Sequence, residues 1–487
     1  MKRNKLTWAL LLTLVWPAMA TVQVHLVAGD RISLSASNAP LPELLCAFAA
    51  QGVKVIADPS LQSTVTLQTT ATDLEKTLNR LLQPYDYAIT WRVLEGPVGQ
   101  LSRLSELRVF EHGNPERVVA VNATPRSEPT VTQTVARVRI VPNEVLLRLK
   151  RGVSTDQFRT LLRGLNADVV DCLRIGGIYR LRLPPGSDVS ALLEQLAGNA
   201  LVDRAEPNYI VELPRSAGTP GTGNSRTIQP PPHSEGPASV AVIDSGFAAT
   251  EDLTTLVTAS YNAVNPGAPM TDTVGHGTQM SRLAAGTSLP ENTDLATPTT
   301  AIIAIKGFDD QGLGNSFELS QAVAYAVDHG ARTLNLSWEV GANSQFVGES
   351  LAYAQNHDVL VIAAAGNTPT GQAVYPAAYP GVVAVSALEA NNRPWALSNY
   401  GTFVALAAPG TAILPTGNTT GSYAGTSIAS AYTAHIVAVY RAANPKATAA
   451  ETRSALLGAL SPAVSDPNGR NYGAGVLDKA AVQRLLH

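Results

Sequence analysis

The chain has 487 residues, and at roughly 150 residues per domain this length suggests about three folded units. Hydrophobic residues make up 45% of the sequence and charged residues only 15%, which excludes a highly charged disordered chain and provides apolar material for sizeable cores. The 35 basic and 38 acidic residues give a formal net charge of −3 without a visible basic block, so no nucleic-acid partner is expected.

Residues 1–20 have the pattern of a secretory signal. Basic residues precede an apolar stretch over residues 6–16, and Ala18 and Ala20 provide a small-residue cleavage site. The alternative is an uncleaved anchor, but this stretch is shorter than the roughly 20 residues that a helix needs to cross a bilayer. No later segment has the length and apolarity of a transmembrane helix. We therefore expect an exported protein, periplasmic or secreted, whose mature chain begins at Thr21.

Residues 21–112 are expected to form a small α+β domain. Apolar residues recur at helical spacing over residues 41–48 and 74–82, and β-prone runs cover residues 53–57, 65–68 and 87–91. The domain contains Ala39-Pro40-Leu41-Pro42-Glu43-Leu44-Leu45, Gly52-Val53-Lys54-Val55 and Asp58-Pro59-Ser60. This sequence pattern resembles that of the short N-terminal domain of secretins and TonB-dependent receptors. The resemblance implies a domain that docks onto envelope proteins and has no catalytic role, whereas the alternative is an unrelated α+β spacer.

Residues 113–140 mix Pro, Thr, Ser and Arg with little periodicity and are interpreted as a linker. A second domain is expected over residues 141–213, with a helix capped by Ser154 and the order βαββαβ of a ferredoxin-like fold. The domain ends in Ala205-Glu206-Pro207-Asn208-Tyr209. This ending resembles the propeptides of subtilisin-like proteases, which cover the enzyme and place their C-terminal tail in the substrate cleft. Such a domain would be the protein's own intramolecular inhibitor. Residues 214–237, rich in Pro and Gly, are expected to be a flexible linker containing the processing site.

The last part of the chain, residues 238–487, is expected to be an α/β domain. Short apolar, β-branched runs alternate with helical patterns; the runs cover residues 240–243, 302–305, 333–336, 359–364 and 382–385. This alternation predicts a parallel sheet flanked by helices, in which sites form at the carboxyl ends of the strands. Polar residues at those ends are therefore the candidates for chemistry.

Asp244 and His276 are candidates for an acid and a base. Asp244 follows the strand 240–243, and a carboxylate at this partly desolvated place suits the orienting acid of a catalytic triad. Its Asp-Ser-Gly context also fits half of an aspartic protease site, but the sequence contains no second copy. His276 lies between Gly275 and Gly277, which let an imidazole reach across a cleft. A lone histidine is more often a surface or core residue, yet of the eight histidines only this one has such a setting.

Ser427 and Asn367 are candidates for a nucleophile and an oxyanion donor. A serine at a helix start is usually an N-cap. Here small neighbours leave the Ser427 hydroxyl accessible, and the helix N-terminus favours developing negative charge. Asn367 follows a strand through Gly366 and by itself is typical of a turn. As a side-chain donor near the nucleophile, it would stabilise an oxyanion.

These candidates occur in the chain order Asp, His, Asn, Ser, within the segments Asp244-Ser245-Gly246, His276-Gly277-Thr278, Ala364-Ala365-Gly366-Asn367 and Gly425-Thr426-Ser427-Ile428-Ala429. Over residues 237–485 they resemble the signatures of subtilisin-like serine proteases, the subtilase family. The resemblance implies a subtilisin-like fold in which Asp244 orients His276, and in which His276 is the general base and then the acid. It also implies that Ser427 is the nucleophile and that Asn367 completes the oxyanion hole with the backbone N–H of Ser427.

The resemblance also locates a substrate cleft. Two segments, Gly312-Leu313-Gly314 and Ser337-Trp338-Glu339, match those that hold an extended substrate peptide by main-chain pairing. The sequence departs from the family at Ala431, where proline is common, and at Glu339, where glycine is usual. Glu339 is expected either to narrow the cleft or to favour a basic substrate side chain, with a solvated carboxylate of no consequence as the alternative.

No cofactor is expected. Asp252 occupies a position that binds a structural calcium in some relatives, but one carboxylate does not make a site that needs six to eight oxygens, so no calcium ligand is assigned. Cys46 and Cys172 lie in different expected domains, so neither a disulfide nor a cysteine zinc site is supported, and both are expected to be buried.

The sequence thus predicts an exported serine endopeptidase, made as a zymogen, that acts on protein or peptide substrates. One alternative is a catalytically silent subtilase-fold module that docks onto an envelope complex. The other is an esterase, but the Gly-x-Ser-x-Gly elbow of many esterases is missing around Ser427.

Overall fold

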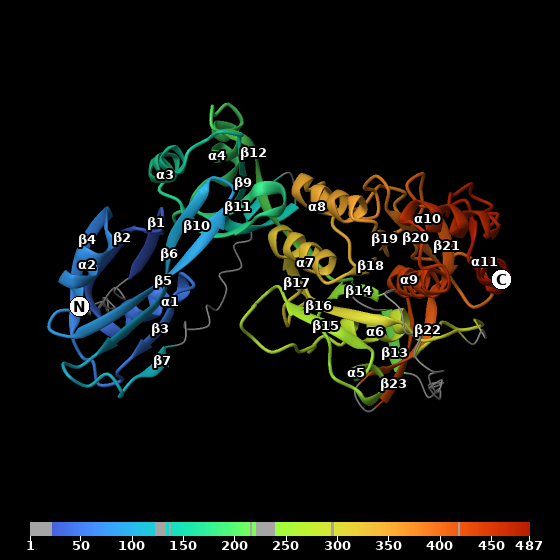
Figure 1. Cartoon of the computed structure of the whole chain (residues 1–487), viewed down its shortest axis with the longest axis horizontal. Helices are drawn as coiled ribbons and strands as arrows, with labels where there is room; N and C mark the ends of the chain where they lie inside the picture. The colour runs from blue at the N-terminus through green and yellow to red at the C-terminus, as the bar shows by residue number, and fades with distance from the viewer. Residues whose placement is uncertain are drawn as a thin grey trace, which may run out of the picture. The chain divides into compact units, whose positions relative to one another are not determined.

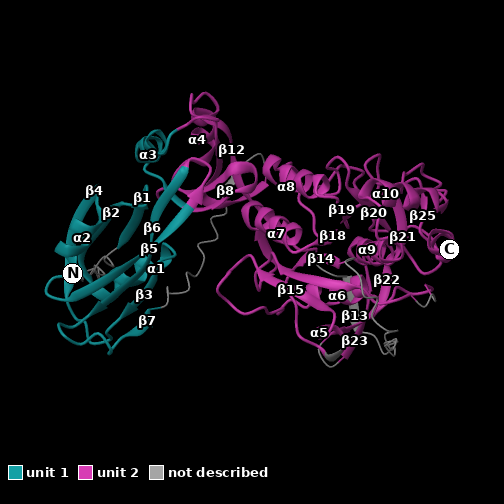
Figure 2. Ribbon diagram, in the orientation of Figure 1, with its two compact units in different colours: residues 1–94, 99–129, 154–169 teal, residues 95–98, 130–153, 170–487 magenta. Residues whose placement is uncertain are grey.

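The structure is a computed structural model that describes residues 22–121, 133–135, 138–214, 217–220, 239–293, 297–416 and 419–487 (Figure 1). The signal sequence expected over residues 1–20 and residues 221–237 of the expected processing linker lie outside the described residues. The chain forms two compact units (Figure 2). Unit 1 contains the described parts of Met1–Leu94, Gly99–Pro129 and Ser154–Val169, and unit 2 contains those of Glu95–Val98, Thr130–Val153 and Val170–His487.

Unit 1 has the small α+β fold that the sequence predicts. Its elements are β1 (Gln23–Val27), β2 (Arg31–Pro40), α1 (Leu41–Ala50), β3 (Lys54–Ala57), β4 (Thr64–Asp73), α2 (Leu74–Leu81), β5 (Asp86–Gly96), β6 (Gly99–Phe110) and β7 (Val119–Val121). They form two sheets with the orders β1-β2-β4 and β5-β6-β3-β7. Helix α2 begins after Asp73, whose carboxylate accepts a hydrogen bond from the backbone N–H of Lys76. Strand β7 lies in the segment that the sequence suggested to be a linker, and it is held by antiparallel pairing with β3.

Unit 1 also includes a helix that we expected in the ferredoxin-like domain. This helix, α3 (Thr155–Gly164), begins at a capping box formed by Ser154 and Gln157. Beyond its end, the buried carboxylate of Asp168 accepts hydrogen bonds from the backbone N–H of Gly29 at 3.0 Å and from Arg103 Nε at 3.1 Å. These buried contacts join the helix to the N-terminal sheets, so the domain boundary expected near residue 141 does not coincide with a boundary between compact units.

The rest of the ferredoxin-like domain, apart from Asp168 and Val169 at the start of β10, belongs to unit 2. Its elements are β8 (Gln133–Val135), β9 (Val138–Leu149), β10 (Asp168–Leu173), the 3-10 turn η1 (Ile175–Gly177), β11 (Ile178–Arg182), α4 (Val189–Ala197) and β12 (Val202–Glu212). The sheet order β10-β11-β9-β12 continues into β17 (Leu313–Asn315) of the C-terminal domain. Leu146 and Ile178 of this sheet pack in one apolar cluster with Phe317 and Phe346. The sheet face left free by its own helices therefore covers the C-terminal domain.

The C-terminal domain is built on a nine-stranded sheet. Its order is β15 (Val257–Asn262), β16 (Ala301–Lys306), β14 (Ser239–Asp244), β18 (Ala331–Leu336), β19 (Leu360–Ala364), β20 (Val383–Leu388), β21 (Leu406–Pro409), β25 (Gly475–Val476) and β24 (Ser461–Pro462). All pairs from β15 to β25 are parallel, and β24 is antiparallel to β25. The predicted parallel α/β fold is confirmed.

Helices cover both faces of this sheet (Figure 1). Apolar residues of α6 (His276–Ala285) and α9 (Thr426–Ala443) pack on one face, and those of α7 (Ser316–Asp328) and α8 (Gln345–Asn356) pack on the other. The remaining elements are α5 (Glu251–Thr254), α10 (Ala449–Gly458), α11 (Lys479–Leu486) and a three-stranded sheet of β13 (Ala217–Pro220), β23 (Thr419–Ala424) and β22 (Thr411–Thr416). Strand β13 lies in the expected processing linker and is antiparallel to β23.

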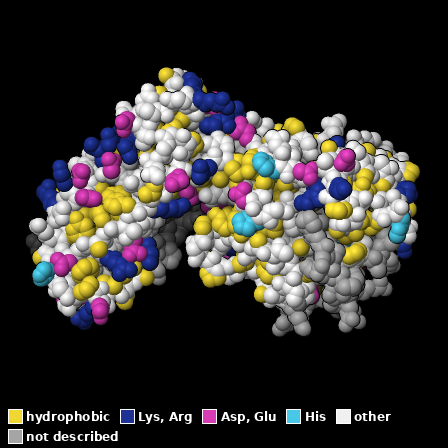
Figure 3. Space-filling view, in the orientation of Figure 1, with side chains coloured by type: hydrophobic (Ala, Val, Ile, Leu, Met, Phe, Trp, Pro, Cys, Tyr) yellow, Lys and Arg dark blue, Asp and Glu magenta, His cyan; other side chains and the backbone are white. Residues whose placement is uncertain are grey.

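The surface of each unit is mixed in charge. Figure 3 shows Lys and Arg side chains interspersed with Asp and Glu on the visible face.

The expectation that Cys46 and Cys172 are buried is wrong, because both are half-buried. Within the described part of the chain, no helix combines the length and the apolarity needed to cross a membrane.

Candidate active site

Asp244 and His276 form a buried hydrogen-bonded pair. Asp244 is the last residue of the central strand β14, and His276 is the first residue of α6. The Nδ1 atom of His276 lies 2.7 Å from Oδ1 of Asp244, with the carboxylate fully buried and the histidine 5% exposed. Such a carboxylate fixes the tautomer of the imidazole and leaves Nε2 available for proton transfer.

Two glycines allow the end of β14 and the start of α6 to approach each other. A Cβ atom on Gly277 would lie 2.3 Å from the carbonyl oxygen of Gly246. Gly246 itself has φ of +122°, and a Cβ there would lie 2.0 Å from the carbonyl oxygen of Thr271. The approach is held by a hydrogen bond of 2.8 Å from the Gly277 N–H to Ser245 Oγ. A side chain at either glycine would separate His276 from Asp244.

Asp272 is a second carboxylate near His276 that the sequence analysis missed. It accepts hydrogen bonds from the Gly275 N–H at 2.8 Å, from the Ser245 hydroxyl at 2.8 Å and from the backbone and hydroxyl of Thr278 at 2.8 and 2.6 Å. It thereby caps the start of α6 and fixes the loop that carries His276. The pattern that would have identified it is an acceptor side chain a few residues before a helix start.

The pKa of His276 reflects opposing effects. Burial alone would lower it, but the charge and hydrogen bond of Asp244, together with the charge of Asp272, raise the pKa of His276 above its ordinary value. An imidazolium at this position would thus be stabilised by two carboxylates.

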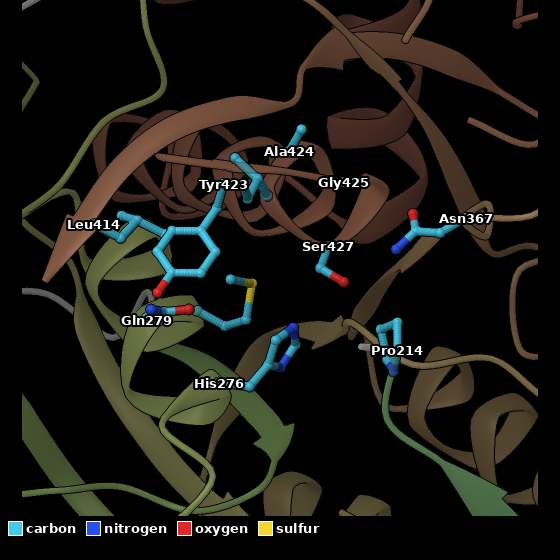
Figure 4. Close-up of a pocket in the computed structure, with 11 residues that line it drawn as sticks. Pro214, His276, Gln279, Asn367, Leu414, Tyr423, Ala424, Gly425 and Ser427 are labelled. Atoms are coloured by element: carbon cyan, nitrogen blue, oxygen red, sulfur yellow. The ribbon is translucent and has the colours of Figure 1, made fainter. Parts of the chain in front are cut away.

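Ser427 lies beside His276 in the same pocket. It is the second residue of α9 and is 4% exposed. Its hydroxyl donates a hydrogen bond of 3.2 Å to the carbonyl oxygen of Ser337, and no hydrogen bond between the described residues joins it to His276. Figure 4 shows the Ser427 hydroxyl surrounded by His276, Asn367 and Pro214. The Ser427 hydroxyl is thus directed to the Ser337 carbonyl, and a proton transfer to His276 would need a rotation of the Ser427 side chain.

Asn367 approaches Ser427 from the loop after β19. Its Oδ1 atom accepts hydrogen bonds from the backbone N–H of Thr426 at 3.0 Å and from the Thr426 hydroxyl at 2.8 Å. The Thr426 hydroxyl in turn accepts from the Gly366 N–H at 3.2 Å. These bonds fix the amide oxygen, so the amide nitrogen is directed toward the pocket (Figure 4). Thr426, whose positioning role was not anticipated, thus orients a donor toward the place where an oxyanion would form.

The two expected cleft segments hold the chain's own residues 210–214, which we call the tail. In β12, Val211 pairs with Gly314 and Glu212 pairs with Leu313, both antiparallel. The Leu213 N–H then donates a hydrogen bond of 2.9 Å to the carbonyl oxygen of Gly312, and Glu212 also forms an antiparallel bridge to Glu339. The tail therefore runs as a strand between the two segments and brings Pro214 into the pocket of His276 and Ser427.

Two other residues from the sequence analysis, Trp338 and Asp252, have side chains that contact neighbouring residues of the catalytic domain. Trp338 is 1% exposed and packs against Phe308 with a ring-centroid distance of 6.0 Å, so its ring supports the cleft from the core. Asp252 forms an ion pair of 2.6 Å with Arg282. Across the described ranges, no cluster of three His, Cys, Asp or Glu side chains is arranged to hold a metal ion.

Comparisons with known proteins agree with this architecture. The model of the subtilase family matches residues 236–475, and that of the fervidolysin N-terminal prodomain matches residues 126–208. The chain is 32% identical over 317 residues to a thermophilic serine proteinase of Bacillus sp. strain AK1, covering 61% of this chain and 78% of that protein. It is 31% identical over 273 residues to subtilisin Savinase of Lederbergia lenta, covering 54% of this chain and 98% of that protein.

A solved structure has the same fold. The crystal structure of fervidolysin from Fervidobacterium pennivorans, a keratinolytic enzyme related to subtilisin, matches with a TM-score of 0.57 and 21% identity. The match covers 72% of this chain and 62% of the fervidolysin chain.

The parallel sheet, the buried Asp–His pair and the adjacent serine define a serine hydrolase whose cleft holds an extended peptide strand. The chain belongs to the subtilase family. It is a serine endopeptidase made as a zymogen, with a fervidolysin-like prodomain that acts as an intramolecular inhibitor. The comparisons provide no support for the catalytically silent binding module.

Proposed function

We propose that Asp244, His276, Ser427 and Asn367 are the catalytic residues of this endopeptidase, and that the zymogen cuts itself at the bond that follows Pro214. The observation that carries the proposal is the course of the tail. It pairs with β17 as an antiparallel strand and ends with Pro214 lining the pocket of His276 and Ser427. Main-chain pairing of this kind is a general way to bind an extended peptide, so the tail occupies the place of a substrate.

The reaction follows from these positions. Ser427 Oγ attacks the carbonyl carbon of Pro214 while Nε2 of His276 takes the hydroxyl proton, and Asp244 stabilises the imidazolium. The resulting oxyanion accepts hydrogen bonds from the Asn367 side chain and from the Ser427 N–H, which lies in the first turn of α9, where N–H groups have no intrahelical acceptor. The C–N bond to residue 215 then breaks as His276 returns the proton to the leaving nitrogen. Water hydrolyses the acyl-enzyme by the same route.

The proposal includes the domain division and the location of the protein. Residues 1–20 would direct export to the periplasm or the medium. Residues 21–112 would dock onto an envelope protein, with residues 113–140 as a linker. Cleavage after Pro214 would separate these residues, together with the prodomain, from the catalytic domain. The contacts of Asp168 with Gly29 and Arg103 support this view, because they join prodomain residues to the N-terminal sheets within unit 1.

The test compares the exported full chain with its Ser427→Ala variant. The wild-type chain is expected to yield a fragment whose N-terminus is residue 215, whereas the variant stays intact and no longer reacts with a fluorophosphonate probe. Ser454→Ala, a change at an exposed serine of α10, is the matched control and should behave as wild type. Normal processing or continued labelling of Ser427→Ala would overturn the catalytic assignment, and a different N-terminus would overturn the cleavage bond.

A further inference from the structure

A second pocket, which shares Pro214 and Asn367 with the pocket of His276 and Ser427, contains a carboxyl group that the mechanism above does not use. Glu339 follows Trp338 after β18 and lines a pocket together with Pro214, Ser337, Ala364, Gly366, Asn367 and Thr426. The backbone N–H of Asn367 donates a hydrogen bond to the carboxyl group. Its Oε2 atom is buried and has no hydrogen-bond partner within the described part of the chain.

Gly366 provides the space for this carboxyl group. Gly366 has φ of +105°, and a Cβ on it would lie 2.0 Å from Oε2 of Glu339. Because the next residue is Asn367, the carboxyl group lies against the same short loop that directs the oxyanion donor. The pocket wall therefore has room for a negative group immediately beside the reacting centre.

The occupant of this pocket in the zymogen leaves the charge of Glu339 uncompensated. Pro214 has neither a charged side chain nor a backbone N–H to donate. No ion pair between the described residues joins Glu339 to a Lys or Arg side chain. Burial accordingly raises the pKa of Glu339 above its ordinary value. A buried carboxylate without a cation is costly, and a cationic side chain entering the pocket would remove that cost.

We propose that Glu339 is a specificity-determining residue that selects substrates with lysine or arginine at the place of Pro214, the residue whose carbonyl carbon is attacked. The inference rests on the proposed function. A lysine or arginine would bring the donors that Oε2 lacks, in a charge-assisted hydrogen bond that is stronger than a neutral one. The tail, which presents proline there, makes the backbone contacts of a substrate without the favourable side-chain contact. It is therefore displaced by substrates that supply a cation.

The test uses the exported full chain after processing and peptides that keep the tail sequence Val-Glu-Leu, followed by Lys or Met and a fluorogenic amide. Met matches Lys in length but has no charge. The kcat/KM ratio of the Lys to the Met peptide is expected to be about tenfold or more in the wild type and close to one in Glu339→Gln. Both peptides are measured with the same enzyme preparation, so a smaller amount of folded or processed protein lowers both kcat/KM values equally and leaves their ratio unchanged.

Two further variants separate charge from size. Glu339→Asp keeps a carboxylate and should retain a preference for the Lys peptide, whereas loss of that preference would contradict a charge-based mechanism. Asp328→Asn removes the same charge from an exposed residue at the end of α7 and should match the wild type.

The outcomes distinguish the inference from the function on which it rests. An equal Lys-to-Met ratio in wild type and Glu339→Gln, or a wild-type ratio of one or below, would overturn the selection by Glu339 alone. If no peptide is hydrolysed and Ser427 does not react with a fluorophosphonate, the proposed function fails, and the inference fails with it.

Discussion

The prodomain contacts the catalytic domain in two regions that differ in kind. The tail contributes mainly backbone, because residues 210–212 pair with β17 as a strand. The second region is the sheet face, whose apolar residues pack on Phe317 and Phe346 and whose polar side chains reach helix N-termini. Asn208 accepts a hydrogen bond of 3.2 Å from the Phe317 N–H of α7, and Glu206 accepts from the Ser344 hydroxyl and from the Gln345 N–H at 2.9 Å at the start of α8.

A substrate peptide can make the same backbone contacts as the tail, but it cannot make the side-chain contacts of the second region. Any extended peptide can pair with β17, so the tail gives little advantage over a substrate. The helix contacts require specific acceptors held by the prodomain sheet, and acceptors at a helix N-terminus meet N–H groups that lack intrahelical partners. We therefore expect the second region to supply most of the affinity that makes the prodomain an inhibitor.

The largest effect is expected for Glu206→Ala. The change removes the acceptor for three hydrogen bonds at the start of α8, including one of 3.4 Å from the Phe346 N–H. Hydrogen bonds to charged groups contribute about 1.5–3 kcal/mol, which corresponds to a tenfold to hundredfold faster loss of the cleaved prodomain. The measurement is the rate at which peptide hydrolysis begins after processing.

Glu194→Ala is the matched control for this prediction, because Glu194 is exposed on α4. It should leave the onset of hydrolysis unchanged. Equal onset rates for Glu206→Ala and wild type would mean that the tail alone holds the prodomain, and the distinction between the two regions would be lost.

The second region should also make prodomain binding dependent on pH. Arg180 lies between two carboxylates, 2.7 Å from Glu144 and 3.4 Å from Glu318. Burial raises the pKa of Glu318 to about 7, although Arg180 acts in the opposite direction, and burial raises the pKa of Glu206 as well. Glu318 therefore holds its proton more tightly in the complex than after separation, when water reaches it, so the complex is more stable at low pH and weakens as the pH rises through about 7. The raised pKa of Glu206 acts in the same direction.

The expected result is a roughly tenfold weaker retention of the cleaved prodomain at pH ~8 than at pH ~6. It is measured as the fraction of residues up to 214 that co-elute with the catalytic domain. Glu318→Gln cannot ionise and should show a smaller dependence. The pKa of Glu144 is lowered, so this carboxyl group does not change its protonation near neutral pH and does not contribute to the expected dependence. Stronger retention at high pH would show that ion pairing with Arg180 outweighs burial.

Local patterns predicted the fold, and they singled out the residues that the structure brings together in the candidate site, for a physical reason. Apolar runs such as residues 240–243 and 333–336 are fully buried strands, and their composition requires burial on both faces. Asp244 and Asn367 follow such strands directly, and a parallel sheet brings these ends to one edge. The order of the motifs then sufficed to expect His276 and Ser427 beside them.

Contacts that depend on the partner rather than on the local sequence were not predictable. The segments of β7 and β13 have the composition of linkers, so the sequence did not predict these short strands. Each is a strand because it pairs with another strand, β7 with β3 and β13 with β23. The hydrogen bond of Ser427 with the Ser337 carbonyl depends on how a side chain rotates in a formed pocket. The same holds for α3, which belongs to unit 1 because of contacts between residues distant in sequence.

The smallest effect is expected for Asp272→Asn, and it concerns the catalytic domain rather than the prodomain contacts. The charge of Asp272 helps to hold the pKa of His276 above its ordinary value, so its removal should move the rising limb of kcat/KM against pH to lower pH. Asn keeps one acceptor oxygen, which can serve the Gly275 N–H or the Thr278 N–H but not both, so part of the cap at the start of α6 is lost as well. Asp328→Asn should leave the profile in place, since that carboxylate is exposed and distant in sequence from the site. A lower kcat/KM with an unshifted limb would instead mean that Asp272 acts only by holding the loop before α6.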